Sequence, residues 1–377
     1  MRTVDAAGLE IGDDHPPRVM GVLNVSKESP YDPSVYDDPA EAAAYVDEEL
    51  IGEGADIVDV GLESANKKFD VLSAEQELDR LETAVQTIAS VSGEAVFSIE
   101  TRYHEVAEAA LQRGFDMVND ICGFADPEMP RVCEEYDVAV GKMASPPDLE
   151  RPGAIEDVDE IYEALFRNGV TDKTIVDPAF GGWSEQKTTD DDRETFRRLR
   201  EFRAVGQPIL VSINRKNFLR ELAGRSTEEA LPVSLAATAM AVERGAHVVR
   251  THDVEETVDA ALVGDTFTRE RVRDHEVGVE ELDVTAVGEA ERQFEAVDGD
   301  TEADPGRAVA RSFALTLPAE ARERLRAAAE DRDVVVAGTG GRVVLAGTVA
   351  GLRSLAGSVD EPPALAAALA RVRDACR

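Results

Sequence analysis

The sequence predicts an α/β protein, a (β/α)8 TIM barrel followed by a small C-terminal α+β domain. Between residues 19 and 273, eight short apolar runs alternate with helix-like stretches, and a barrel of this kind typically takes about 250 residues. One phrase also occurs three times, as "EGADIVDV" at 53–60, "RGFDMVND" at 113–120 and "RGAHVVRT" at 244–251. In each copy a glycine ends a helix and an apolar pair forms a buried strand. Such a repeat builds parallel strands that are joined by helices.

The apolar periodicity places each element. The predicted strands are Val19–Leu23, Ile57–Val60, Val96–Ile99, Met117–Asn119, Val138–Gly141, Ile175–Val176, Ile209–Ile213 and Val248–Arg250. The predicted helices are Pro39–Gly52, Ala74–Val91, Tyr103–Arg113, Pro127–Tyr136, Val158–Asn168, Asp190–Arg203, Val233–Arg244 and a last one from Val254. Periodicity alone leaves a doubly wound open sheet as the alternative, and the number of strand–helix units favours the barrel.

Composition shifts divide the chain into three parts. Residues 1–273 form the predicted barrel, 274–306 an acidic linker that contains "DGDTEADPG", and 307–377 the small α+β domain. In this last part "SFALTL" predicts a strand, "PAEARERLRAAAEDRD" a helix, "VVVAGTGGRVVLAG" a hairpin that turns at Gly340–Gly341, and "TVAGLRSLAG" another helix. The "GTGG" segment lies between two alternating runs, which favours a hairpin turn over a phosphate loop.

The charge narrows the class of protein. A net charge of −37 argues against nucleic-acid and anionic-membrane partners, and with seven lysines against thirty-three arginines it favours a halophilic protein. The chain has no run of about 18 apolar residues and no signal-peptide core, so we expect a soluble, cytoplasmic protein. Three cysteines without metal spacing argue against a disulfide framework and a zinc site.

Polar residues stand at the predicted strand ends, where a barrel of this kind carries its catalytic groups. They are Asn24, Glu63, Glu100, Asn119, Lys142, Asp177, Asn214, Arg215, Lys216, Arg250 and His252. Lysines are rare in this chain, yet Lys27, Lys67, Lys68, Lys142, Lys187 and Lys216 all follow or end strands. These positions predict a positive mouth suited to phosphate or diphosphate. Asp59, inside a strand, is equally consistent with a functional residue and with an internal hydrogen-bonding one.

Seven segments in order carry a family resemblance over residues 18–272. They are "VMGVLNVSKES", "EGADIVDVGLES", "SIETRYHEVAEAAL", "MVNDI", "IVDPAFG", "LVSINRKNFL" and "VVRTHDV". Together they resemble dihydropteroate synthase, a pterin-binding barrel that joins a dihydropterin diphosphate to p-aminobenzoate in folate synthesis.

The resemblance implies a role for each matching residue. Asn24 would bind the diphosphate and its Mg²⁺, and Arg250 with His252 would hold the diphosphate. Glu100, Asn119, Asp177 and Lys216 would hold the pterin, with Lys216, Arg250 and Asp177 as the catalytic set. It also implies a homodimer. The loop Ser64–Asp70, "SANKKFD", lacks the Thr and Arg that serve p-aminobenzoate in the family, and Lys67 or Lys68 would replace that Arg.

Two other readings stay open at this point. One is a pterin-binding methyltransferase that acts with a corrinoid protein, although a methyl carrier offers no diphosphate to Arg250 and His252. The other is a non-catalytic pterin-binding scaffold, with the C-terminal unit as its interaction module. Release of pyrophosphate would separate the synthase from both.

Overall fold

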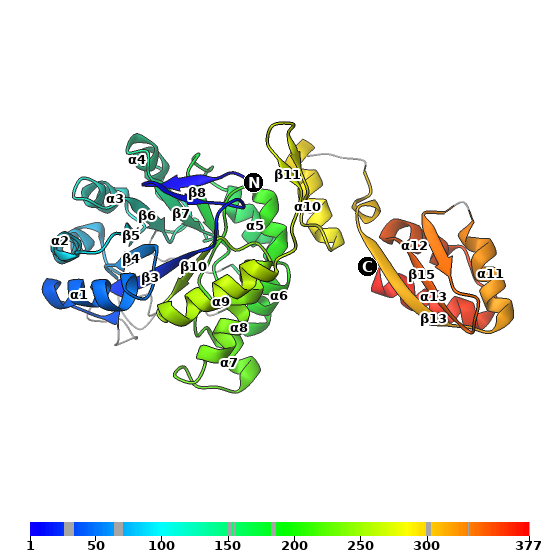
Figure 1. Cartoon of the computed structure of the whole chain (residues 1–377). Coiled ribbons are helices and arrows are strands. Elements are labelled where there is room, and N and C mark those ends of the chain that lie inside the picture. The colour runs from blue at the N-terminus through cyan, green and yellow to red at the C-terminus, as the bar shows by residue number, and fades with distance from the viewer. Residues whose placement is uncertain are drawn as a thin grey trace. The chain divides into compact units, whose positions relative to one another are not determined.

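The computed structural model describes residues 1–25, 34–63, 71–149, 153, 155–181, 186–298, 303–330 and 332–376. The chain forms two compact units, Met1–Glu270 and Arg271–Arg377. In the first unit the labelled strands lie inside a layer of helices (Figure 1). Across the described part of the chain, no helix is long and apolar enough to cross a membrane.

Eight parallel strands form the wall of the first unit, which confirms the predicted barrel. In chain order they are β3 (Arg18–Asn24), β4 (Ile57–Gly61), β5 (Val96–Thr101), β6 (Met117–Asp120), β7 (Ala139–Met143), β8 (Thr174–Asp177), β9 (Leu210–Val211) and β10 (Val248–Thr251). Each strand from β3 to β7 pairs with the next one, and β10 pairs with both β3 and β9. A parallel bridge between Val176 and Ile209 joins β8 to β9 and completes the ring, which an open sheet would lack.

Helices follow the strands and cover the outside of the ring. They are α1 (Pro39–Tyr45), α2 (Ala74–Ser90), α3 (His104–Leu111), α4 (Met129–Glu135), α5 (Val158–Phe166), α6 (Thr189–Arg197), α7 (Asn217–Ala223), α8 (Leu231–Glu243) and α9 (Val254–Phe267). Local sequence sets several of their starts: Ser73 and Gln76 form a capping box at α2, and the Asp38 side chain caps α1. The short helix α7 lies in a stretch for which the sequence analysis predicts no element.

Side chains alternate along each strand, and this alternation sorts the inside of the barrel into two layers. The layer at the amino ends of the strands is apolar and contains Met20, Ile57, Met117, Ala139, Ile175, Leu210 and Val248. A hairpin of β1 (Val4–Ala6) and β2 (Leu9–Ile11), which the sequence analysis did not predict, packs Val4, Ala6 and Ile11 into the same cluster. The hairpin closes this end of the barrel, and the polar residues of the other layer lie toward the carboxyl ends.

Lys142 is a wrong prediction for the mouth of the barrel. On β7 it follows Val140 by two residues, and Val140 belongs to the core outside the strands. The Lys142 side chain is fully buried, and its Nζ donates to the carbonyl oxygens of Leu165 at 3.0 Å, Arg167 at 2.5 Å and Gly169 at 2.6 Å. It therefore caps the carboxyl end of α5, where carbonyl groups lack helical partners.

The second unit is built on a three-stranded antiparallel sheet in the order β13-β15-β14. Its elements are β13 (Ala310–Thr316), α11 (Ala319–Ala329), β14 (Val334–Ala337), β15 (Arg342–Thr348), α12 (Val349–Gly357) and α13 (Pro363–Ala375). The segment 338–341 turns between β14 and β15, as the sequence predicts. Leu325, Leu352 and Leu369 from the three helices share one core with Leu345 of the sheet.

The stretch 274–306 contains more structure than the predicted linker. Strands β11 (Arg273–Asp274) and β12 (Val279–Glu280) form a hairpin, and α10 (Val287–Asp298) follows. Ala290 is buried in the core of the second unit, with Val284 and Val287 packed against it. Val287 and Ala290 lie three residues apart on α10 and so share one helix face, while Val284 precedes the helix. Many acidic neighbours conceal this short apolar pattern in the sequence.

Candidate functional site

An arginine on β10 forms hydrogen bonds with two carboxylates, which lie on the neighbouring strands β4 and β5. The Arg250 Nε donates to Asp59 Oδ2 at 2.7 Å and its Nη2 donates to Glu100 Oε2 at 2.7 Å. Burial opposes the charge of Arg250, but Glu100 and Asp59 raise the pKa of Arg250 above its ordinary value. For Glu100, burial itself raises the pKa, and the charge of Arg250 opposes that shift.

Asp59 is an internal hydrogen-bonding residue. It is fully buried, and it accepts from Ser98 Oγ at 2.8 Å and from Asn119 Nδ2 at 2.9 Å as well as from Arg250. The resemblance proposes Asn119 as a pterin contact, and Asp59 already accepts a hydrogen bond from the Nδ2 group of this amide. Its Oδ1 faces Gly141, where an added Cβ would lie only 2.9 Å away. Glycine at 141 therefore leaves room for the amide.

Asp177 and two lysines lie together at the ends of β8 and β9. Burial raises the pKa of Asp177 to about 6, and the charges of Lys216, Arg250 and Lys187 oppose the shift. Burial lowers the pKa of Lys216, and the charge of Arg250 lowers it further. The Lys216 chain lies across Gly181, which has a φ of +92°, and an added Cβ there would meet Lys216 Cδ at 2.9 Å. Any larger residue at 181 would displace this lysine.

The predicted positive mouth is only partly described. Lys27, Lys67 and Lys68 lie outside the described residues, so these predictions stay untested. Of the described lysines, Lys187 and Lys216 come near Asp177, and Lys187 also pairs with Asp192 at 3.3 Å and donates to the Ala179 carbonyl at 2.7 Å. Because carboxylates lie close to both lysines, the described part of the mouth is mixed in charge.

His252 is held next to Arg250 as a neutral imidazole. Burial and the charge of Arg250 lower the pKa of His252 to about 3. The adjacent Asp253 makes a two-point ion pair with Arg215, with Nε and Nη2 donating at 2.8 Å each, and accepts from Asn214 Nδ2 at 2.8 Å. Asn214 and Arg215 therefore fix the loop that carries His252, a positioning role.

Asn24 ends β3 beside Gly61 of β4. Its Nδ2 donates to Ser34 Oγ at 3.0 Å, and a Cβ added at Gly61 would lie 3.1 Å from its Oδ1. That amide oxygen accepts no hydrogen bond from the described residues. Amide oxygens are suitable ligands for Mg²⁺, which usually takes one or two protein ligands plus substrate phosphates. The residue present therefore fits a magnesium ion that is shared with a phosphate group.

A cluster beside the loop 64–70 joins Glu63, one of the polar strand-end residues of the sequence, to Arg102 and Tyr103, which no sequence pattern singles out. Arg102, whose side chain is 0% exposed, donates from Nη1 to Glu63 Oε2 at 2.5 Å and from Nη2 to the Leu72 carbonyl at 2.8 Å. Tyr103 Oη donates to the same carbonyl at 2.8 Å, and Glu63 Oε1 accepts from Leu72 N at 2.8 Å. We call Glu63, Arg102 and Tyr103 the loop clamp, because they join residues 63 and 72 at the two sides of that loop.

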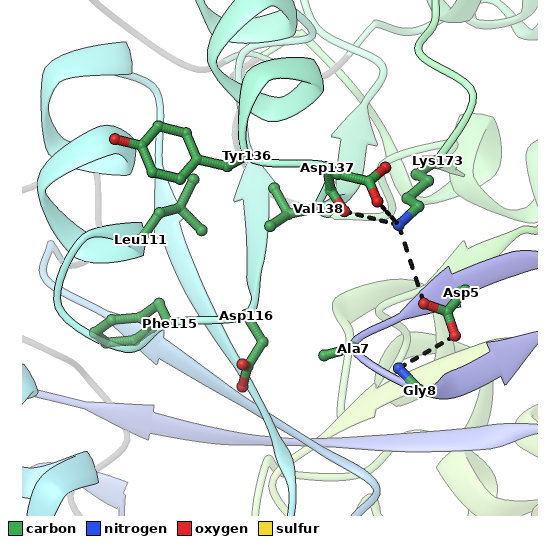
Figure 2. A pocket seen from close by; sticks show the side chains of 10 residues that line it. All are labelled: Asp5, Ala7, Gly8, Leu111, Phe115, Asp116, Tyr136, Asp137, Val138 and Lys173. Carbon is green, nitrogen blue, oxygen red and sulfur yellow. Dashed lines mark hydrogen bonds and ion pairs between the residues drawn. The ribbon is translucent and has the colours of Figure 1, made fainter.

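A hollow of about 430 Å³ lies elsewhere, at the amino ends of the strands (Figure 2). Lys173 spans one side of it, with Nζ 3.0 Å from Asp137 Oδ2 and 4.0 Å from Asp5 Oδ1. Asp5 belongs to the hairpin that closes this end of the barrel, and none of the predicted site residues lines the hollow. In barrels of this type the chemistry takes place at the opposite, carboxyl end.

Known proteins that are similar to this chain belong to the family whose motifs stand at the carboxyl ends of its strands. A family model described as pterin binding enzyme matches residues 20–252. The dihydropteroate synthase of Bacillus subtilis is 30% identical over 255 residues, which cover 66% of this chain and 88% of that protein. A probable bifunctional folylpolyglutamate synthase/dihydropteroate synthase of Halobacterium salinarum is 34% identical over 259 residues. That match covers 66% of this chain and 31% of the bifunctional protein, so the chain spans about a third of its length.

A solved structure gives the same result for the fold. The dihydropteroate synthase of Coxiella burnetii, in complex with pteroic acid, superimposes with a TM-score of 0.60 and 29% identity, over 72% of this chain and 99% of that one. The sequence match, the closed barrel and the family motifs at the carboxyl ends of its strands agree. The chain belongs to the pterin-binding enzymes, as a member of the dihydropteroate synthase family.

Proposed function

We propose that this protein condenses 6-hydroxymethyl-7,8-dihydropterin diphosphate with p-aminobenzoate, or a related arylamine, and releases pyrophosphate. The observation that carries the proposal is the buried group of Asp59, Glu100 and Arg250 beside Asp177 and Lys216, at the carboxyl end of a dihydropteroate synthase barrel. A methyl carrier would give Arg250 and His252 no anion to bind, so the methyltransferase reading is not favoured.

Each group has a chemical task in this reaction. Carboxylates accept hydrogen bonds from the N–H groups of a pterin, a role for Asp177 and for the oxygen of Glu100 that Arg250 leaves unused. Arg250 has further N–H donors besides the two that bind Asp59 and Glu100, and they can reach the diphosphate. Neutral His252 donates to the same anion. As the amine nitrogen bonds to the exocyclic methylene, the C–O bond breaks, the amine loses a proton and pyrophosphate leaves.

Binding and charge stabilisation then account for catalysis without a covalent intermediate. Asn24 would hold Mg²⁺ through its amide oxygen, and the ion would neutralise charge on the diphosphate. Lys216, which lies between Asp177 and the Arg250 group, adds a cation where negative charge leaves the pterin.

The test follows both products at once. With the dihydropterin diphosphate, Mg²⁺ and p-aminobenzoate in molar KCl, we expect equal amounts of pyrophosphate and dihydropteroate. Pyrophosphate without dihydropteroate would mean that the C–O bond breaks with water as the acceptor in place of p-aminobenzoate, and other arylamines would then be supplied in turn. Pterin binding with neither product, across a panel of arylamines, would support the scaffold reading and overturn the proposal.

Pterin binding should depend on pH through Asp177. Because burial raises its pKa to about 6, the carboxylate is ionised at pH 7.5 and becomes protonated as the pH falls through 6. We expect the affinity for a pterin to fall up to about tenfold per pH unit below that point. The Asp177→Asn variant should bind more weakly and show a flatter profile in calorimetry between pH 5 and 8, with circular dichroism as the check on folding. An unchanged profile in that variant would contradict the assignment.

The loop clamp should act on the second substrate. The altered loop 64–70 stands where the family binds its arylamine, and Arg102 with Tyr103 holds Leu72 at its far side. We expect Arg102→Met to raise the KM for the arylamine by about tenfold, while the pterin affinity stays within about twofold. Arg131→Met, on the exposed side of α4, is the matched control. Equal losses for both substrates would mean that Arg102 supports the whole barrel rather than the loop.

We also propose a homodimer that forms through α8 and α9. Several large apolar side chains on these helices are exposed, which a water-facing helix normally avoids: Met240, Leu262, Val263 and Phe267, the last with 80% exposure. An apolar patch of this kind is a candidate protein–protein interface, and Phe267→Asp should weaken the dimer in analytical ultracentrifugation.

A halophilic, cytoplasmic setting is part of the proposal. The net charge of −37 makes the folded chain repel itself, and salt screens that repulsion. We expect the midpoint of thermal unfolding to rise as KCl is raised from millimolar to molar concentration. Sucrose at matched water activity is the control, because it leaves the charges unscreened. A midpoint that is independent of KCl would contradict the halophilic reading.

A further inference from the structure

We propose that the exposed face of the β13-β15-β14 sheet packs against the same face of a second copy of this chain. Helices cover one face of the sheet, where Leu315, Val343 and Leu345 are buried. The other face carries the alternate positions Ala310, Ser312, Ala314, Thr316, Val335, Ala337, Arg342, Val344, Ala346 and Thr348. None of these residues is fully buried, and Val335 and Val344 are 65% and 44% exposed.

The residues on this face are unusual for a face in contact with water. An antiparallel sheet with one solvated face normally alternates apolar and polar side chains. Here six of the ten outward residues are alanine or valine, and none is acidic, in a chain with 77 acidic residues among 377. The absence of carboxylates at these positions points to a face that is covered in the working protein.

Net charge separates this part of the chain from the rest. Residues 307–377 have eleven arginines, no lysine and eight acidic residues, a net charge of +3. Residues 1–306 have 29 basic and 69 acidic residues, a net charge of −40. Two copies that approach through the acidic part repel each other, whereas two C-terminal sheets meet with little repulsion. A second copy can therefore use this face more readily than most of its surface.

The pattern of side chains is complementary to itself. One cross-strand row is Ser312, Ala346 and Val335, and the next is Ala314, Val344 and Ala337. Each row has one valine beside small residues, so a two-fold rotation can set the valines of one copy over the alanines of the other. Facing sheets interdigitate in this way about 10 Å apart.

The face does not fit a partner that binds by charge. Arg342 is the one cation among the ten outward positions, and other exposed arginines, Arg324 and Arg373, lie on helices α11 and α13. Ten residues a side is also no more than half of the roughly 20–30 in a stable interface. We therefore infer a weak contact, driven by apolar burial, which molar salt strengthens rather than weakens.

Cysteine cross-linking of the full chain tests this contact. The natural cysteines, Cys122, Cys133 and Cys376, are buried, so their background reaction should be small. On mild oxidation in molar KCl, Ala346→Cys, on the central strand, should give a covalent dimer, and less of it in millimolar KCl. Leu222→Cys, which places a thiol at a 71% exposed position on α7, is the matched control and should stay monomeric.

Two further variants separate the outcomes. Adding Val344→Asp to Ala346→Cys should remove the cross-link, whereas adding Phe267→Asp, which acts on the α8–α9 patch, should leave it. The inference is overturned if Ala346→Cys gives no dimer, if Leu222→Cys cross-links as well, or if the yield falls as KCl is raised. None of these readouts depends on catalytic activity.

Discussion

Replacing Asp59 by alanine will lower the free energy of unfolding by about 3 kcal/mol and abolish pterin binding. The reason is the burial of Arg250, whose Nε keeps its charge inside the barrel by donating to Asp59 at 2.7 Å. Removing that carboxylate leaves a buried cation with one partner, Glu100, and also leaves the Ser98 and Asn119 donors without an acceptor. Breaking a buried pair from one side typically destabilises a protein by 3–5 kcal/mol.

Urea denaturation in molar KCl would measure this effect. Asp172→Ala removes a carboxylate that is 95% exposed and paired with Arg2 on the surface, so it should change the unfolding free energy by less than about 1 kcal/mol. Asp59→Asn keeps the shape and an acceptor oxygen, and we expect an intermediate loss. A change below 1 kcal/mol for Asp59→Ala would mean that the network adds no stability.

Two lysines, Lys216 half-buried and Lys142 fully buried, should give opposite results when each is replaced by methionine. Lys216→Met should lower kcat/KM by about 10²–10³, the usual loss when one group that stabilises a transition-state charge is removed. Its stability should be kept, because burial of the Lys216 ammonium is unfavourable and already lowers its pKa. Lys142→Met should keep the kinetic constants and lose about 2–3 kcal/mol, since three carbonyl oxygens at the end of α5 lose their donor.

The pair of variants forms its own control. Both changes delete an ammonium group inside the barrel unit and insert a side chain of similar length. An effect common to both changes therefore cannot explain opposite results. Steady-state kinetics and urea unfolding on both proteins complete the comparison. If Lys142→Met lowered kcat/KM as strongly as Lys216→Met, the conclusion that Lys142 takes no part in the reaction would be wrong.

The barrel could be predicted from the sequence because the patterns that mark its strands and helices are formed by residues close together in the chain. Each strand carries a short apolar run and each helix a stop, as in "EGADIVDV", and these signals survive without knowledge of neighbours. The hairpin β1–β2 has strands of three residues, too short to show a period, and its partners lie as far along the chain as Val248. Contacts of that range leave no local pattern.

The positions of the candidate site residues were predictable in part. Asn24, Glu100, Asp177 and Arg250 stand where a polar residue ends a strand, and their place at the carboxyl ends follows from the fold. The position of Lys142 was predicted wrongly because a residue at a strand end points inward or outward according to the alternation along the strand. Counting by two from Val140 places Lys142 on the outside. Arg102 carried no such signal, because its partners, Glu63 and Leu72, are set by tertiary contacts alone.

The hairpin at the closed end of the barrel has a consequence for biosynthesis. A ribosome delivers Val4, Ala6 and Ile11 before any of the eight barrel strands, yet their binding surface includes Leu210 and Val248. Met20 and Ile57 can cover part of the hairpin early, but its contacts with Leu210 and Val248 need the last strands, and closing so long a loop comes late in folding. Until then its three apolar side chains are only partly covered, so a chaperone can recognise them, and the barrel is completed by one of its earliest segments.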